Sequence, residues 1–308
     1  MVSRMCAKDM VKKIDSTKII YKFSAANKPV EEASPGELVI FETLDCLSGQ
    51  IKSEMDSISA IDWSRVNGAT GPLYVRNTEP GDTLVVEIVD INVDDKAFIL
   101  TVPGYGFLSD KKFSSKIKFL EADKYVTKFG SLKIKSNPMV GTIGVAPAYG
   151  EIPCGDLGRH GGNMDVPILN AGSKLYLPVS VKGALLALGD LHTIQADGEL
   201  CVSAAETSGE VLVRVDVIKG KQPRLPLIEN RDIVAVLAFG NTVDEALHAA
   251  TETAIEALMF SNNLSFEGAY MLGSLVVNLR INQLVDPKKG VRAEISKDFV
   301  KIKDFLTI

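Results

Sequence analysis

Two proline-glycine turns, each followed at once by a long β-branched run, constrain the fold of this chain more than any other feature. Ser34-Pro35-Gly36-Glu37 precedes Leu38–Thr43, and Glu79-Pro80-Gly81-Asp82 precedes Thr83–Ile91. Glycine supplies the backbone conformations that a tight turn needs, whereas Val, Ile and Thr pack well on a pleated sheet. The pattern therefore predicts a mainly β fold with a sandwich-like or barrel-like core.

The pattern changes after residue 227. Thr242-Val243-Asp244-Glu245 forms a capping box and opens a helical pattern that extends to Phe260, and a second helical pattern covers about Ser265 to Val277. Leu279–Val285 alternates like a strand. We expect two regions: residues 1–227, β-rich and carrying the active site, and residues 228–308, an α+β region with two helices and an architectural or oligomeric role.

Charge and apolar runs exclude two classes of partner. The net charge of −5 argues against nucleic acid, because neutralising phosphates requires a basic surface. No run of about 18 apolar residues is present, so we expect no membrane span. Lys8 and Asp9 interrupt the N-terminal segment, which lacks the apolar core of a signal peptide and so predicts a cytoplasmic protein. Cys6, Cys46, Cys154 and Cys201 form no Cys-x-x-Cys pair, which favours free thiols.

Acidic side chains and one of the three histidines gather around Asp197-Gly198, between two apolar runs that resemble a β-hairpin. Asp190 and His192 are two residues apart and face the same way on a strand. A three-residue loop, 196–198, would bring Glu206 to that face, whereas a two-residue turn would send it to the other. With the longer loop, an imidazole between two carboxylates suits Zn²⁺. In the alternative, His192 packs near a strand end and the acids are solvated.

A second group of candidates follows the strand Leu38–Thr43. Asp45 leaves the end of this strand, and Gln50 follows after small residues. Scaffolds often present ligand-binding side chains on such loops. We expect Asp45 to be a further metal ligand or to position water, and Gln50 to contact substrate. The alternative for Asp45 is a simple turn residue.

A third group lies in the glycine-rich segment His160-Gly161-Gly162-Asn163. His160 is a candidate metal ligand or proton donor. Gly161 and Gly162 would leave room for a very small substrate against backbone amides, as an oxyanion hole requires, and we place Asn163 in the same substrate site. In the alternative, His160 only holds the backbone of the loop. Nearby acids, Asp165 and Asp197, are candidates for a structural Ca²⁺.

Six separate blocks of the sequence, taken in order, resemble the acetamidase/formamidase family. They are Phe41–Asp45 with Gly49–Ile51, Thr70–Val75 with Glu79–Asp82, Gly144–Pro147, His160–Asp165, Gly189–His192 with Asp197–Glu199, and Asp286-Pro287 ahead of Gly290–Arg292. The resemblance implies a β-rich homo-oligomer, which we expect to be a dimer. It also implies hydrolysis of the C–N bond of short-chain primary amides, formamide and acetamide, to a carboxylate and ammonia.

The implied reaction needs an activated water, a site for the oxyanion and an acid for the departing nitrogen. A divalent metal, best matched by Zn²⁺, would supply the first two, held by His192, Asp190 and one or two of Asp45, Glu206 and His160. Glu206 or Asp45 would move the proton. We expect a pocket scarcely larger than a formyl or acetyl group.

Two rival interpretations remain open. In the first, Cys46 or Cys154 acts as a nucleophile, as in other amide-hydrolysing folds. In the second, the chain is a non-catalytic, metal-dependent β protein that binds a small ligand.

Overall fold

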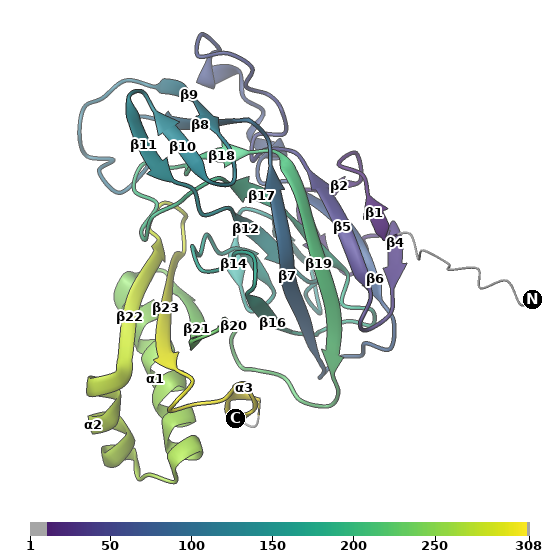
Figure 1. Ribbon diagram of the computed structural model, residues 1–308, viewed down its shortest axis with the longest axis vertical. Coiled ribbons are helices and arrows are strands. Elements are labelled where there is room, and N and C mark those ends of the chain that lie inside the picture. The colour runs from purple at the N-terminus through teal and green to yellow at the C-terminus, as the bar shows by residue number, and fades with distance from the viewer. Residues whose placement is uncertain (1–10, 307–308) are drawn as a thin grey trace, which may run out of the picture.

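Two large β-sheets pack face to face, and helices lie at one end of the molecule (Figure 1). The computed structural model describes residues 11–306. Cys6 and the segment with Lys8 and Asp9, on which the signal-peptide prediction rested, lie outside the described residues.

The first sheet has nine strands, and neighbouring strands are antiparallel except for the first pair. In spatial order the strands are β1 (Lys12–Ile14), β5 (Leu38–Thr43), β19 (Gly209–Ile218), β7 (Thr83–Val93), β16 (Lys174–Pro178), β20 (Leu227–Glu229), β21 (Ile233–Gly240), β23 (Lys289–Ser296) and β22 (Val277–Gln283). Both predicted turn-strand units therefore form strands of this sheet, β5 and β7.

The second sheet has twelve strands and carries most of the candidate site. Its main path is β11 (Leu132–Lys135), β10 (Val126–Phe129), β9 (Lys116–Ala122), β8 (Lys96–Thr101), β18 (Glu206–Thr207), β17 (Leu186–His192), β12 (Met139–Gly144), β15 (Gly161–Asn163) and β14 (Leu157–Gly158). Strand β6 (Ala69–Val75) pairs with β17, and β2 (Ile19–Ile20) and β4 (Glu31–Ala33) pair with β6. Strands β3 (Lys22–Ser24) and β13 (Glu151–Pro153) form a separate pair. Two short 3-10 helices, η1 (Ile58–Ala60) and η2 (Trp63–Arg65), lie between β5 and β6.

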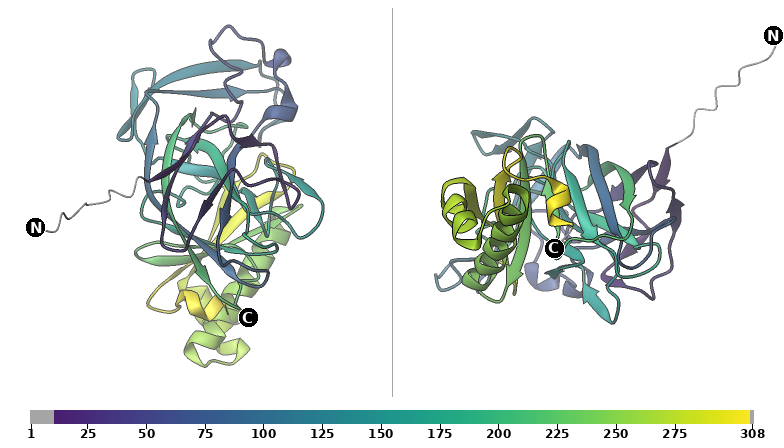
Figure 2. Two further views of the ribbon diagram at one scale, coloured as in Figure 1. Left: turned by 90° about the vertical axis from the view of Figure 1, so that its right-hand side faces the viewer. Right: turned by 90° about the horizontal axis from the view of Figure 1, so that it is seen from below.

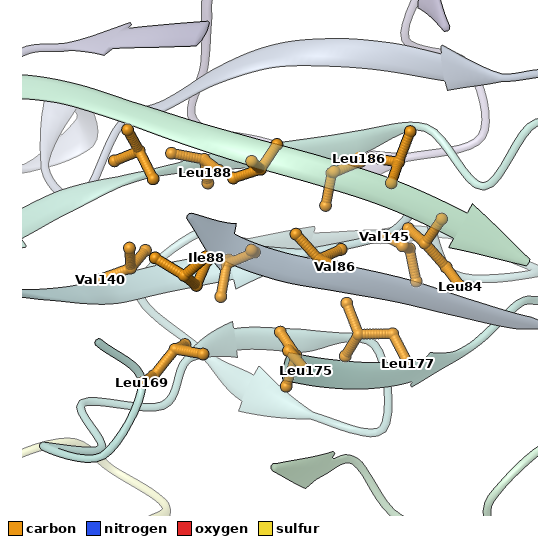
Figure 3. Packing of buried hydrophobic residues seen from close by; sticks show 14 of the residues in the cluster. Leu84, Val86, Ile88, Val140, Val145, Leu169, Leu175, Leu177, Leu186 and Leu188 are labelled. Atoms are coloured by element: carbon orange, nitrogen blue, oxygen red, sulfur yellow. The ribbon is translucent and has the colours of Figure 1, made fainter. Parts of the chain in front are cut away.

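The main core lies between the two sheets, as Figure 3 shows. Leu84, Val86 and Ile88 of β7 alternate along the strand and meet Leu186 and Leu188 of β17 from the other sheet. Each such side chain contributes about 1.5–3 kcal/mol when fully buried. The fold is therefore a β-sandwich, and neither sheet closes into a barrel within residues 11–306.

Helix α1 (Val243–Asn262) covers one face of β21 and β23, and α2 (Phe266–Val276) packs against α1 (Figure 2). Thr242 caps α1 by accepting a hydrogen bond from the Glu245 amide, and Glu245 accepts one from the Asn241 amide in return. A short helix, α3 (Ile302–Phe305), packs beside α1. The mainly β fold with C-terminal helices is confirmed. None of the helices in the described part of the chain has both the length and the apolar composition that crossing a membrane requires.

The boundary between the two predicted regions falls inside the nine-stranded sheet. Strand β20 pairs with β16 on one side and with β21 on the other, so the sheet is continuous there. The division at residue 228 stays a prediction.

The predicted three-residue hairpin loop at 196–198 is wrong. Strands β17 and β18 do pair, but His192 is opposite Glu206, and residues 193–205 form the connection. Gly198 instead bonds to the C-terminal part of the chain: its amide donates to the Asn282 carbonyl at 2.9 Å, and its carbonyl accepts from the Leu284 amide at 3.1 Å. These bonds draw the segment away from the hairpin.

Candidate active site

His192 lies at the centre of a buried acidic cluster. It ends β17, is only 1% exposed, and is opposite Glu206 on β18. Its Nε2 atom is 3.1 Å from Glu206 Oε2, 3.4 Å from Asp190 Oδ1 and 3.9 Å from Asp165 Oδ1. One imidazole nitrogen therefore faces three carboxylates that come from separate parts of the chain.

Gln195 fixes the orientation of this imidazole. Its amide nitrogen donates to the carbonyls of Asp165, at 2.7 Å, and Asn282, at 3.2 Å. The amide oxygen of Gln195 is thereby turned toward His192 Nδ1, 3.0 Å away, and accepts a hydrogen bond from the Nδ1–H group. A neutral His192 then carries its proton on Nδ1 and presents a lone pair from Nε2 to the cluster, which is the tautomer that a metal ligand needs.

Four carboxylate oxygens in the cluster have no hydrogen-bond partner among the described residues. They are Asp165 Oδ1, Asp190 Oδ1, Glu199 Oε2 and Glu206 Oε2, and all four side chains are buried. Burial raises the pKa of Asp165, Glu199 and Glu206. Although burial opposes a charged imidazole, Glu206 and Asp190 raise the pKa of His192 well above its ordinary value of 6.5. Four carboxyl groups face one imidazole, so ionising all four inside the protein would require positive charge beyond that of one imidazolium.

Two sets of donor atoms in this cluster are close enough to hold a metal ion. One set comprises Asp165, His192 and Glu199, the other Cys46, Asp190 and Glu206, and within each set the donor atoms lie within 4.8 Å of one another. Imidazole nitrogen, carboxylate oxygen and thiolate sulfur are the donors that Zn²⁺ takes in proteins. The unpartnered oxygens and the donor chemistry both fit a divalent cation.

Asn163 links the cluster to a further buried acid, Asp286. Its Nδ2 atom donates to Asp165 at 2.5 Å and to Asp286 at 3.0 Å, while its Oδ1 accepts from Thr142 at 2.6 Å. Burial raises the pKa of Asp286 to about 7, although the hydrogen bond from Asn163 works in the opposite direction. Asp286 can therefore hold or release a proton near neutral pH.

A cleft of about 480 Å³ reaches the cluster from outside. Cys46 and Asp286 both line it, and they connect it to the buried acids. The cleft is larger than the formyl-sized or acetyl-sized pocket expected from the sequence.

Comparison with known proteins decides the family. Residues 12–153 and 152–295 match the model of the Acetamidase/Formamidase family. The chain belongs to this family.

Solved structures of family members share the whole architecture. An acetamidase from Bacillus halodurans is 35% identical, with a TM-score of 0.90, over 96% of this chain and 100% of that chain. A predicted acetamidase/formamidase from Thermoanaerobacter tengcongensis is 37% identical, with a TM-score of 0.91, over 96% and 97% of the two chains. A putative formamidase from Schizosaccharomyces pombe is 28% identical over 61% of each chain, so the chain spans about three fifths of the length of that relative. These family names are those of amidohydrolases that act on linear amides.

Within this family fold, three of the predicted metal ligands come together. His192, Asp190 and Glu206 lie in one cluster, whereas the fourth, Asp45, bonds within its own loop. The Asp45 carboxylate accepts hydrogen bonds from the amides of Leu47, at 2.9 Å, and Gly49, at 3.1 Å, and burial raises its pKa. It stabilises the loop that places the next residue, Cys46, in the cluster. The ligand and catalytic roles of Asp45 stay predictions.

His160 lies outside the cluster. Its ring packs edge-on against Phe23, with centroids 5.1 Å apart, and burial lowers its pKa to about 4. Gly162, two residues later, belongs to β15 at a φ of +90°, and a Cβ there would lie 1.9 Å from the Asp156 carbonyl oxygen. Close backbone packing therefore accounts for this glycine, and the same holds for Gly161, where a Cβ would lie 2.2 Å from the Ile143 carbonyl oxygen. The catalytic role of His160 and the substrate-binding roles of both glycines stay predictions.

Gln50 and Asp197 bond to partners outside the cluster. The Gln50 amide donates to the Asp62 carbonyl and accepts from the Asp62 amide, which closes the loop between them. Asp197 pairs with Arg292 at 2.8 Å and Arg280 at 3.5 Å. Substrate contact by Gln50 and a structural Ca²⁺ on Asp165 and Asp197 stay predictions.

Sequence reasoning missed several members of the site. Glu199 and Asp286 stand in the Asp-Gly-Glu and Asp-Pro blocks that resemble the family, and Gln195 lies three residues after His192. Position within those blocks was the available signal for the two acids. Nothing in the local sequence distinguishes Gln195 from a solvent-exposed loop residue.

Proposed function

We propose that this chain hydrolyses the C–N bond of short-chain primary amides, with formamide and acetamide as the simplest substrates, to a carboxylate and ammonia. The single observation that carries the proposal is the set of four buried, unpartnered carboxylate oxygens around His192, which a divalent cation and an activated water would satisfy. Membership of the Acetamidase/Formamidase family supports the same reaction class.

The residues that would hold the cation are His192, Asp165 and Glu199, with Cys46, Asp190 and Glu206 beside them. We propose Zn²⁺ as the cation, since the donors include nitrogen and sulfur. When bound, such a cation lowers the pKa of a bound water and polarises the substrate carbonyl.

The side chains around this site perform the remaining tasks. Gln195 keeps the Nε2 lone pair of His192 directed at the acids. The Ala204 amide holds Glu206 by donating to Oε1 at 2.7 Å. We assign proton transfer to Asp286, which lines the cleft and has a pKa of about 7, so that its carboxyl group can protonate the departing nitrogen near neutral pH.

The environment of the cysteines argues against thiolate attack. Burial, together with Glu206 and Asp190, raises the pKa of the Cys46 thiol well above its ordinary value of 9.0. Burial raises the pKa of Cys154 to about 12, and its thiol lies 3.6 Å from the Ile20 carbonyl. Reactive cysteines need the opposite surroundings, which stabilise the thiolate.

Ammonia release from formamide and acetamide tests the proposal. We expect turnover by the native protein, loss of turnover in a chelator with recovery on adding Zn²⁺, and a loss of at least about a hundredfold in kcat/KM for His192→Ala. Cys154→Ala should still turn over. Activity that survives complete removal of metal but vanishes in Cys46→Ala or Cys154→Ala would favour a cysteine nucleophile. A protein that releases no ammonia with metal bound would be a binding protein.

A further inference from the structure

The cleft that leads to the acid cluster is much larger than the reacting group. A water molecule takes up about 30 Å³ in the liquid, so acetamide, with four non-hydrogen atoms of similar size, needs about 120 Å³. The cleft has about 480 Å³. Most of its volume is therefore available to the part of a substrate that does not react.

One wall of the cleft is aromatic. Trp63, the only tryptophan in the sequence, and Tyr105 both line it, with their rings parallel to within 3° and their centroids 6.1 Å apart. Trp63 is 46% exposed and Tyr105 is 52% exposed, so their outer surfaces are open. Val66, Leu100 and Val202 continue the apolar lining. Large exposed aromatic groups beside a cleft mark a ligand surface more often than a core.

Both rings are held by their own loops. Trp63 begins η2, and the residue that caps η2, Asp62, accepts hydrogen bonds from the amide and hydroxyl of Ser64. The loop that carries Tyr105 is tied to the opposite loop by a 2.8 Å hydrogen bond from the Phe107 amide to the Leu200 carbonyl. Gly106 permits that approach, because a Cβ there would lie 2.4 Å from the Cys201 carbonyl oxygen. The aromatic wall is therefore formed before any ligand binds, which lowers the entropy cost of binding.

We propose that this site takes primary amides whose acyl group carries a neutral aromatic ring, of the phenylacetamide class, in preference to acetamide. The inference rests on the proposed function. The carboxamide faces Cys46 and Asp286, and the ring lies along Trp63 and Tyr105. The two rings stack on each other and so offer one continuous aromatic surface, on which a flat ring packs better than a flexible alkyl chain does. The negative cluster at the inner end disfavours an anionic acyl group.

Steady-state ammonia release from metal-loaded protein tests the preference. We expect kcat/KM for phenylacetamide to exceed that for acetamide at least tenfold. Trp63→Ala should lower this ratio about tenfold, and Trp63→Phe should recover most of it. Tyr149→Ala is the matched control, because Tyr149 is an exposed aromatic residue that does not line the cleft. In this variant the ratio of kcat/KM for phenylacetamide to kcat/KM for acetamide should equal that of the native protein.

Fluorescence gives a second measurement that does not depend on turnover. Because Trp63 is the only tryptophan, excitation at long wavelength reports this wall alone. Phenylacetamide should change the emission of Trp63 in a saturable way. The phenylacetamide concentration that gives half of the full change should be at least tenfold below the acetamide concentration that does so.

The outcomes separate the two claims. Ammonia from acetamide with no gain for phenylacetamide, or emission that phenylacetamide leaves unchanged, overturns the aromatic preference while the proposed function stands. Ammonia from neither amide, in protein that holds its metal, overturns the proposed function and the preference with it.

Discussion

At the scale of single residues, His192 and Gln195 show how one side chain orients another that could bind a metal. The amide nitrogen of Gln195 donates to the backbone carbonyls of Asp165, before β17, and of Asn282, on β22. Only the amide oxygen of Gln195 can then face the imidazole of His192. The direction of the Gln195 amide therefore follows from the fold, and the tautomer of His192 follows from Gln195.

Gln195→Ala removes the acceptor for His192 Nδ1. We expect kcat/KM for acetamide and the affinity for the metal to fall about 10–100-fold, the usual effect of losing a partner that orients a metal ligand. Zinc titration and ammonia release measure the two quantities. The control is Gln222→Ala, an amide in the loop before β20 and outside the cleft. Native metal affinity in Gln195→Ala would show that His192 needs no such support.

His160 predicts a pH dependence of stability. Its folded pKa of about 4 lies below its ordinary value of 6.5, so between these values the unfolded chain binds a proton that the folded chain does not. This contribution to stability is complete above about pH 6.5 and falls as the pH drops toward 4, by about 2 kcal/mol between pH 7 and pH 5. Urea unfolding at pH 7 and pH 5 should show a smaller decrease in the free energy of unfolding for His160→Asn than for the native protein. An equal decrease in both proteins would contradict the assignment.

Local patterns predicted only part of the residue-level site. Asp190, His192 and Glu206 were grouped from strand periodicity, because strands β17 and β18 pair as neighbours in sequence. The sequence offers Asp165 only as a candidate ligand for a structural Ca²⁺, and Asp286 only as part of a block that resembles the family. These two acids lie 27 and 94 residues from His192 along the chain, and local sequence spacing carries no information on such contacts.

At the scale of elements, turn and capping chemistry predicted well where the partners were local. The capping box at Thr242 and the Pro-Gly turns before β5 and β7 depend on residues within four positions of one another. The hairpin loop failed because its Gly198 bonds to residues 282 and 284, far along the chain. Long-range pairing overrode a good local turn signal.

Close backbone packing at β15 can be tested by comparing alanine substitutions at Gly162 and Gly172. Gly162 and Gly172 have almost the same φ, +90° and +89°, but a Cβ at Gly162 meets the Asp156 carbonyl at 1.9 Å, whereas nothing lies within 4 Å of a Cβ at Gly172. Gly172→Ala should cost about 1–2 kcal/mol of unfolding free energy, the cost of the left-handed backbone. Gly162→Ala should cost at least about 2 kcal/mol more, because the backbone must shift. Equal losses in urea unfolding would show that packing at β15 does not require glycine.

At the scale of the whole molecule, the sandwich leaves one end of the nine-stranded sheet open. Strand β22 is the last strand of that sheet: it pairs with β23, the Gly198 segment bonds to its C-terminal end, and no other described strand pairs with its outer edge. Beside it, α2 exposes Met271 by 68% and Leu275 by 82%. An open strand edge next to an apolar helix face is a surface that proteins usually cover.

We propose that a second copy of the chain covers this end and forms a homodimer. Purified protein should then have a mass of twice 33.2 kDa, about 66 kDa, by light scattering. Met271→Glu combined with Leu275→Glu should yield the single chain. The control is Leu132→Glu, which changes an exposed leucine on β11, at the end of the other sheet. A dimer that persists in the double variant but dissociates in Leu132→Glu would place the interface at that other end.

The central claim is that the buried acids around His192 are a cation site on which amide hydrolysis depends. Elemental analysis of the purified protein, paired with acetamide turnover on the same sample, tests it most directly. We predict at least one equivalent of divalent metal per chain in the native protein, and in His192→Ala a loss of metal and of turnover in parallel. Full turnover in native protein that contains no metal would contradict the account.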